Sequence, residues 1–166
     1  MSKEPLPWLD TAISLIGTQE TPGNADNPRI IQWAKNIGGW VASYYKSDSI
    51  PWCGLFVGHC MAANGITPPK DMLSALAWNN YGTKLKEPMY GCIIVFKRQG
   101  GGHVGFAVSQ DATTYHVLGG NQSNSVNITR VAKERCVGWR WPDYYRLPGE
   151  KLPVRKFDGK ISTNEA

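Results

Sequence analysis

The chain has 166 residues, 42% hydrophobic and 19% charged, which is the composition of a globular protein with one domain. This composition excludes a wholly disordered chain, and no run approaches the roughly 20 apolar residues that a membrane-spanning helix needs. Lys and Arg number 18 against 13 Asp and Glu, a net charge of +5 and an isoelectric point near 9.1.

A moderately basic protein suits an anionic polymer such as nucleic acid, a membrane surface or a bacterial cell wall. No basic run interleaved with aromatic residues is present, so we expect no nucleic-acid partner. The first residues, MSKEPLPWLD, lack the basic and apolar regions of a signal peptide. We therefore expect synthesis in the host cytoplasm, followed by release or delivery if the protein acts outside it.

The N-terminal half predicts several helices. Pro7 opens the first, which Gly17 ends, and Asn27 and Pro28 begin a second that breaks at Gly38-Gly39. We interpret residues 40–50 as a loop. A central helix follows over 51–63, with Ser49 as its candidate cap, and another lies around 72–80. The expected apolar faces of the first two helices are Leu9, Ala12, Ile13 and Ile16, then Ile30, Ile31 and Ala34.

After residue 91 the apolar period changes from helical to two. Strand-like runs cover 92–98, 103–109, 113–119 and 125–131, and turn-rich residues separate them. Short connections between consecutive strands favour an antiparallel meander, and GWRWP indicates a last sheet element. Helices followed by strands predict an α+β fold. We expect one domain over 1–147 and a polar, flexible tail over 148–166.

Cys53 is the candidate nucleophile among the four cysteines. It stands in PWCG at the expected N-terminus of the central helix, where the helix dipole and unpaired N–H groups favour a thiolate. Cys60 lies deeper in that helix and is expected to be buried, and Cys92 and Cys136 have no comparable setting. Since no C-x-x-C pair is present, we expect no metal and no other cofactor.

His103 is the candidate base, because it opens a strand directly after three glycines and can face another element. His59 lies six residues from Cys53 on a different helix face, and His116 is a mid-strand histidine expected in the core or on the surface. Asn121 follows the next strand and is the candidate orienting residue, with Gln122 and Asp111 as rivals.

Five segments stand out in chain order, over roughly residues 8–142: PWCGLFVGHCMAANGI, GCIIVFKR, GGGHVGFAV, VLGGNQSNSVNI and VGWRWP. In sequence and in order they resemble the motifs of the bacterial and phage branch of the CHAP and NlpC-type cysteine peptidases. The resemblance implies a papain-like fold, with the cysteine on a central helix packed against an antiparallel sheet. It assigns Cys53 as nucleophile, His103 as base and Asn121 as orienting residue. Trp52 stands where many NlpC-type members have Asp, and many CHAP relatives have an acidic third residue.

The resemblance also implies a peptidoglycan substrate, cut either at the muramoyl-L-alanine amide or at a stem-peptide bond. Trp52, Trp78, Gln122 and Glu20 are the candidate substrate-binding residues, although core packing is the plainer interpretation of either Trp and a solvated acid that of Glu20. We expect a monomeric phage endolysin. The alternatives are a secreted antibacterial amidase effector, an acyl transferase with the same residues, and a non-catalytic wall-binding or virion module.

Overall fold

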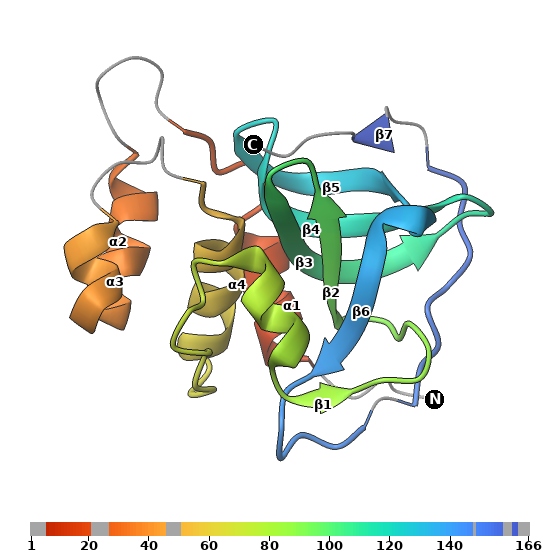
Figure 1. Cartoon of the computed structure of the whole chain (residues 1–166), viewed down its shortest axis with the longest axis horizontal. Coiled ribbons are helices and arrows are strands. Elements are labelled where there is room, and N and C mark those ends of the chain that lie inside the picture. The colour runs from red at the N-terminus through yellow and green to blue at the C-terminus, as the bar shows by residue number, and fades with distance from the viewer. Residues whose placement is uncertain (1–5, 21–26, 46–50, 148, 158–160, 163–166) are drawn as a thin grey trace.

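The computed structural model describes residues 6–20, 27–45, 51–147, 149–157 and 161–162. The helices lie on one side of the molecule and a seven-stranded sheet on the other (Figure 1). Helix α4 (Cys53–Ala62) packs against β3 (Gly101–Gln110) and β4 (Thr114–Gln122). Its neighbours are α1 (Pro7–Ser14) and α2 (Pro28–Ile37), so the central helix is enclosed and forms the middle of the core. The mixed α+β class is confirmed.

The sheet has the order β1-β6-β2-β3-β4-β5-β7. The predicted meander is β2 (Ile93–Arg98), β3, β4 and β5 (Ser125–Ala132), in which each strand is antiparallel to the next. Strand β6 (Cys136–Trp141) returns to pair with β2, and β1 (Thr83–Lys84) pairs with β6. The predicted last sheet element is therefore correct, although it lies beside the first long strand.

Helix starts follow the expected chemistry. Asn27 caps α2, because its side chain accepts a hydrogen bond from the backbone N–H of Arg29, and Pro7 occupies the first turn of α1. The predicted apolar face of α1 is partly wrong. Trp8, Leu9 and Ala12 are buried there, whereas Ile13 and Ile16 are nearly half exposed.

The predicted loop over 40–50 is wrong in its first part. Gly38 and Gly39 have positive φ angles and re-aim the chain, and a second short helix, α3 (Gly39–Tyr44), follows directly. Residues 46–50, including the candidate cap Ser49, lie outside the described residues. Helix α4 instead begins after Trp52 as its N-cap, with Pro51 outside the helix. The predicted helix at 72–80 is a shorter 3-10 helix, η1 (Ala75–Asn80).

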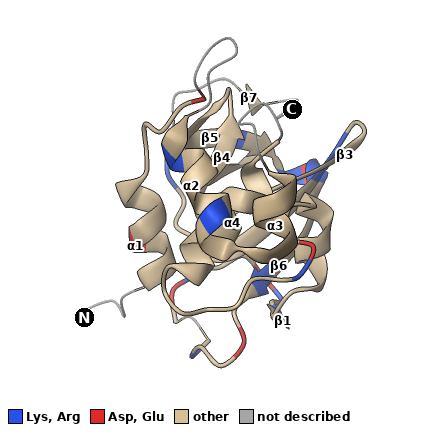
Figure 2. Ribbon diagram, turned by 90° about the vertical axis from the view of Figure 1, so that its left-hand side faces the viewer, with Lys and Arg blue, Asp and Glu red and all other residues tan. Residues whose placement is uncertain are grey.

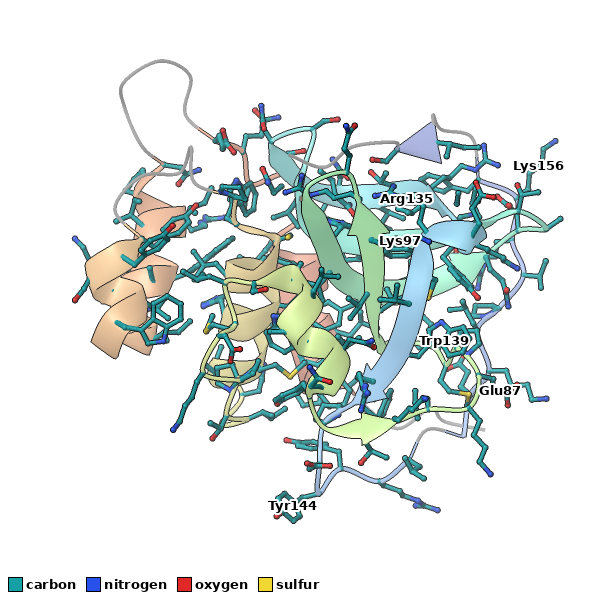
Figure 3. All side chains as sticks on the ribbon, in the orientation of Figure 1. Glu87, Lys97, Arg135, Trp139, Tyr144 and Lys156 are labelled. Carbon is teal, nitrogen blue, oxygen red and sulfur yellow. The ribbon has the colours of Figure 1, made fainter. Side chains whose placement is uncertain are left out.

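The described part of segment 149–162 lies along the sheet. Leu152 is buried, the backbone of Gln110 bonds to Pro153 and Arg155, and β7 (Ile161–Ser162) runs parallel to β5. The domain boundary at 147 and the mobility of the tail stay predictions. No helix among the described residues is long and apolar enough to cross a membrane. Tyr144, fully exposed, points away from the fold (Figure 3).

Candidate active site

Cys53 is the first residue of α4, as the sequence predicts. Gly54 lets this end of the helix approach the chain around Met72, because a Cβ at Gly54 would lie 2.1 Å from the Met72 carbonyl oxygen. Gly58, one turn further, packs against the Met72 side chain in the same way. The Cys53 side chain is only 6% exposed, yet it lines a cleft that opens beside the helix.

His103 lies on β3 and contacts the Cys53 thiol. Burial raises the pKa of Cys53, but the hydrogen bond to His103, the charge of its ring, and backbone hydrogen bonds at Val104 and Gly54 outweigh it. The net effect lowers the pKa of Cys53 below its usual value. A lowered pKa increases the fraction of thiolate, which is the nucleophilic form.

The other three thiols behave differently. Burial raises the pKa of Cys60 well above its usual value, that of Cys92 to about 12 and that of Cys136 to about 11. Cys60 and Cys92 are completely buried. Cys53 is thus the one cysteine of the chain whose surroundings favour the thiolate, and it is the cysteine that the helix N-terminus argument selects.

Gln122 contacts the histidine. The Gln122 Oε1 atom lies 2.9 Å from His103 Nε2. The Gln122 amide nitrogen donates to the carbonyls of Val117 and Asn127 and to the Asn127 side chain, so the carboxamide orientation is set by its donors. Oε1 therefore accepts from His103, and the proton of the neutral ring lies on Nε2.

The Gln122 side chain follows a bulge in β4. The β4–β5 register shifts between Gly119 and Gln122, and Asn121 adopts a left-handed φ of 58°. The bulge breaks the simple alternation of side chains that a regular strand would have. Gly119 leaves room for the pair, because a Cβ there would lie 2.9 Å from Gln122 Oε1 and 3.5 Å from His103 Nε2. Asn121 is buried beside them.

Asp111, the other rival orienter, belongs to a second cluster. Its Oδ2 atom lies 3.0 Å from His116 Nε2, while Ser109 Oγ lies 2.6 Å from His116 Nδ1. Arg130 contacts the same Asp111 oxygen at 3.1 Å. His103 and Ser109 lie near opposite ends of β3, so this partly buried polar cluster is separate from Cys53.

The predicted substrate-binding residues are not in the cleft. Trp52 and Trp78 are completely buried, and their indole N–H groups donate to Glu20 Oε1 and to the Met72 carbonyl. Both tryptophans pack in the core, which the sequence analysis gave as the plainer interpretation. Glu20 contacts Trp52, and Gln122 contacts His103 instead of facing the cleft.

The cleft beside Cys53 has a volume of about 420 Å³. Its walls are α3, the segment 73–76 and the β2–β3 hairpin. The sequence analysis did not identify the α3 wall, because it interpreted residues 40–50 as a loop. The signal in the sequence that could have identified it is the pair Trp40 and Tyr44, two aromatic residues one helical turn apart. The lining residues are Trp40, Tyr44, Pro51, Cys53, Leu73, Ser74, Ala75, Leu76, Arg98, Gly101 and Gly102.

Few charged residues mark the helical side of the molecule (Figure 2). Within the described ranges, no group of three His, Cys, Asp or Glu side chains is placed to hold a metal ion. The chemistry that this arrangement supports is nucleophilic attack by a thiolate that a histidine activates, inside a cleft large enough for a peptide segment.

Residues 44–121 match the family model of the CHAP domain. The matched range contains Cys53 and His103 and ends at Asn121, one residue before the glutamine that contacts the histidine. No curated protein and no solved structure matches the chain significantly.

Proposed function

We propose that this chain hydrolyses an amide bond of bacterial peptidoglycan, because residues 44–121 match the CHAP domain. CHAP domains form a family of cysteine- and histidine-dependent amidohydrolases and peptidases. The observation that carries the proposal is the Cys53 thiol at the N-terminus of α4, in contact with His103 and open to the cleft. The intact pair also favours an enzyme over a non-catalytic module of the same fold.

The proposed reaction begins with proton transfer. With Nε2 bound to Gln122, Nδ1 is the ring nitrogen of His103 that takes the Cys53 proton. The thiolate attacks the amide carbonyl, and the backbone N–H of Cys53 at the helix N-terminus stabilises the oxyanion. His103 returns the proton to the leaving amine, a thioester remains on Cys53, and water hydrolyses it to the acid and the free thiol.

The proposed third residue is Gln122. A carboxamide that accepts from Nε2–H holds the imidazole in the tautomer that can act as a base at Nδ1. Asn121, to which the family resemblance assigns the orienting role, precedes Gln122 in the chain and is also buried.

The biological setting that we propose is lysis of the bacterial wall as a phage endolysin. The net charge of +5 suits binding to an anionic wall, and the sequence contains no basic nucleic-acid-binding motif that would explain this charge otherwise. The matching test is expression in the bacterial cytoplasm with and without a membrane-permeabilising agent, where lysis of the culture only with the agent supports the endolysin role.

The experiment that tests the enzyme is digestion of purified peptidoglycan under reducing conditions, followed by mass spectrometry of the products. Wild type is expected to release new amino termini, whose position separates amidase from endopeptidase. Cys53→Ala is expected to release none, and Cys60→Ala, in the same helix but fully buried, serves as the matched control. No release by wild type from several wall chemotypes contradicts the proposal. Equal release by Cys53→Ala rejects the nucleophile.

A further inference from the structure

We propose that the cleft beside Cys53 selects a stem-peptide segment that carries a free carboxylate, which pairs with Arg98 while Trp40 and Tyr44 cover the peptide. This inference rests on the proposed function, since it names the part of the substrate that lies next to the nucleophile. Arg98, Trp40 and Tyr44 all line the same cleft as Cys53.

The aromatic wall comes from α3. Trp40 and Tyr44 are 48% and 61% exposed, and their ring centroids lie 6.1 Å apart. The indole is held in place, because Trp40 Nε1 donates to the Lys70 carbonyl at 2.8 Å. Large aromatic side chains left exposed beside a nucleophile, with one of them already oriented, offer contact area to a ligand at little cost in conformational entropy.

The β2–β3 hairpin provides the cation of the cleft, the Arg98 guanidinium. Arg98 ends β2, directly across from Gly101, and its Nε–H donates to the Gly102 carbonyl at 3.0 Å. Nη1 donates to the Gln99 carbonyl at 3.4 Å, so the guanidinium lies flat on the hairpin. Arginine has five N–H donors, and these two contacts leave others for a ligand.

The charge of Arg98 is available to a substrate. In the parts of the chain that the structure describes, no Asp or Glu side chain forms an ion pair with it. Leu76, 41% exposed, and Ala75 give the cleft an apolar floor. A guanidinium beside apolar and aromatic surfaces binds a carboxylate more strongly than one in bulk water does.

Stem peptides fit this combination, because they carry small apolar side chains and free carboxylates. Some walls instead carry a carboxamide where others carry the free acid. The cleft therefore discriminates between them, and the charge-assisted hydrogen bond corresponds to a preference of about 10–100-fold for the acid.

The test is calorimetric binding to Cys53→Ala protein, which cannot turn the ligand over. The probes are two synthetic tetrapeptides, L-Ala-γ-D-Glu-L-Lys-D-Ala and its isoglutamine counterpart, which differ in one carboxylate. We expect the acid to bind about 10–100-fold more tightly, Arg98→Gln to abolish that preference, and Trp40→Ala to weaken both ligands. Arg135→Gln is the matched control, since Arg135 lies with Lys97 on the side away from α2 and α3 (Figure 3).

Three results overturn the proposal: equal affinity for the two peptides, a preference that survives Arg98→Gln, or no measurable binding of either peptide. Failure of the proposed function gives a different result. If wild type does not cleave peptidoglycan but the Cys53→Ala protein prefers the acid through Arg98, the binding site stands and the hydrolase does not.

Discussion

The carboxamide oxygen of Gln122 lies 2.9 Å from Nε2 of His103, and both side chains are almost completely buried. The glutamine amide nitrogen is in turn bound to Val117 and Asn127. This chain of contacts extends from β5 through the glutamine to the histidine and the Cys53 thiol. The imidazole orientation therefore depends on the sheet, through a residue that follows the bulge in β4.

Substitution separates the roles of Gln122 and Asn121. Gln122→Ala is expected to lower kcat by about 10²–10⁴-fold with a smaller change in KM, because the ring loses the partner that holds its tautomer. Asn121→Gly keeps the left-handed backbone without strain and is expected to cost less activity than Gln122→Ala. The opposite order of the two variants in a peptidoglycan release assay would return the orienting role to Asn121.

Selective alkylation follows from the thiol environments. At neutral pH, iodoacetamide is expected to label Cys53 first, because its pKa is lowered while that of Cys136 is about 11. His103→Ala should slow labelling of Cys53, since the burial that raises its pKa then acts without the main compensating contact. Peptide mass spectrometry against pH measures both rates. Preferential labelling of the partly exposed Cys136 would contradict the assignment.

The Asp111 cluster predicts an acid-sensitive contribution to stability. The hydrogen bond to His116, followed by that to Thr114, holds the pKa of Asp111 far below its usual range. A pKa lower in the folded than in the unfolded chain contributes stability that is present above the unfolded value, near 3.8, and is lost as the pH falls.

Asp111→Asn is therefore expected to lower Tm at pH 6 and to reduce the difference in Tm between pH 6 and pH 3. Asp71→Asn, at an exposed position, is the control and should leave that difference unchanged. Thermal unfolding followed by circular dichroism measures both. If Asp111→Asn and wild type show the same pH dependence of Tm, the ionised Asp111 carboxylate does not contribute the stability that we predict.

Leu152 tests whether the C-terminal segment belongs to the fold. Its side chain is 4% exposed, so Leu152→Ala is expected to lower the free energy of unfolding by about 2–5 kcal/mol. Val154, two residues on, is 77% exposed, and Val154→Ala should have little effect. Urea denaturation compares the two. Equal, negligible effects would support the flexible tail that the polar sequence predicts.

The sequence predicted the elements best where a single physical signal decided them. Asn27 before Pro28 marked a helix start, and the apolar alternation after residue 91 marked the meander. Cys53 was expected near the start of the central helix, where the helix dipole favours a thiolate, and it is the first residue of α4. These signals depend on residues that are close together in the sequence, so contacts between distant segments do not change them.

The errors depended on contacts between distant segments. The contact of Gln122 with His103 comes directly after a bulge in β4, which no periodicity shows in advance. Trp52 and Trp78 were also candidates for the groove, but both are buried and donate to acceptors on distant or neighbouring segments, in line with the core packing that was the plainer interpretation. The helix carrying Trp40 exists because Gly38 and Gly39 re-aim the chain, and six residues are too few for a periodic pattern to register.

Strand β6 has a consequence for dissecting this protein. The matched range 44–121 holds the nucleophile and the base, yet the outer edge of β2 is covered only when residues 136–141 pair with it. During synthesis on the ribosome, both of these residues emerge before the strand that seals this edge. A fragment cut to the matched range would keep Cys53 and His103 but expose an unpaired strand edge, and would self-associate before it could work. The smallest useful piece of this chain therefore extends at least through Trp141.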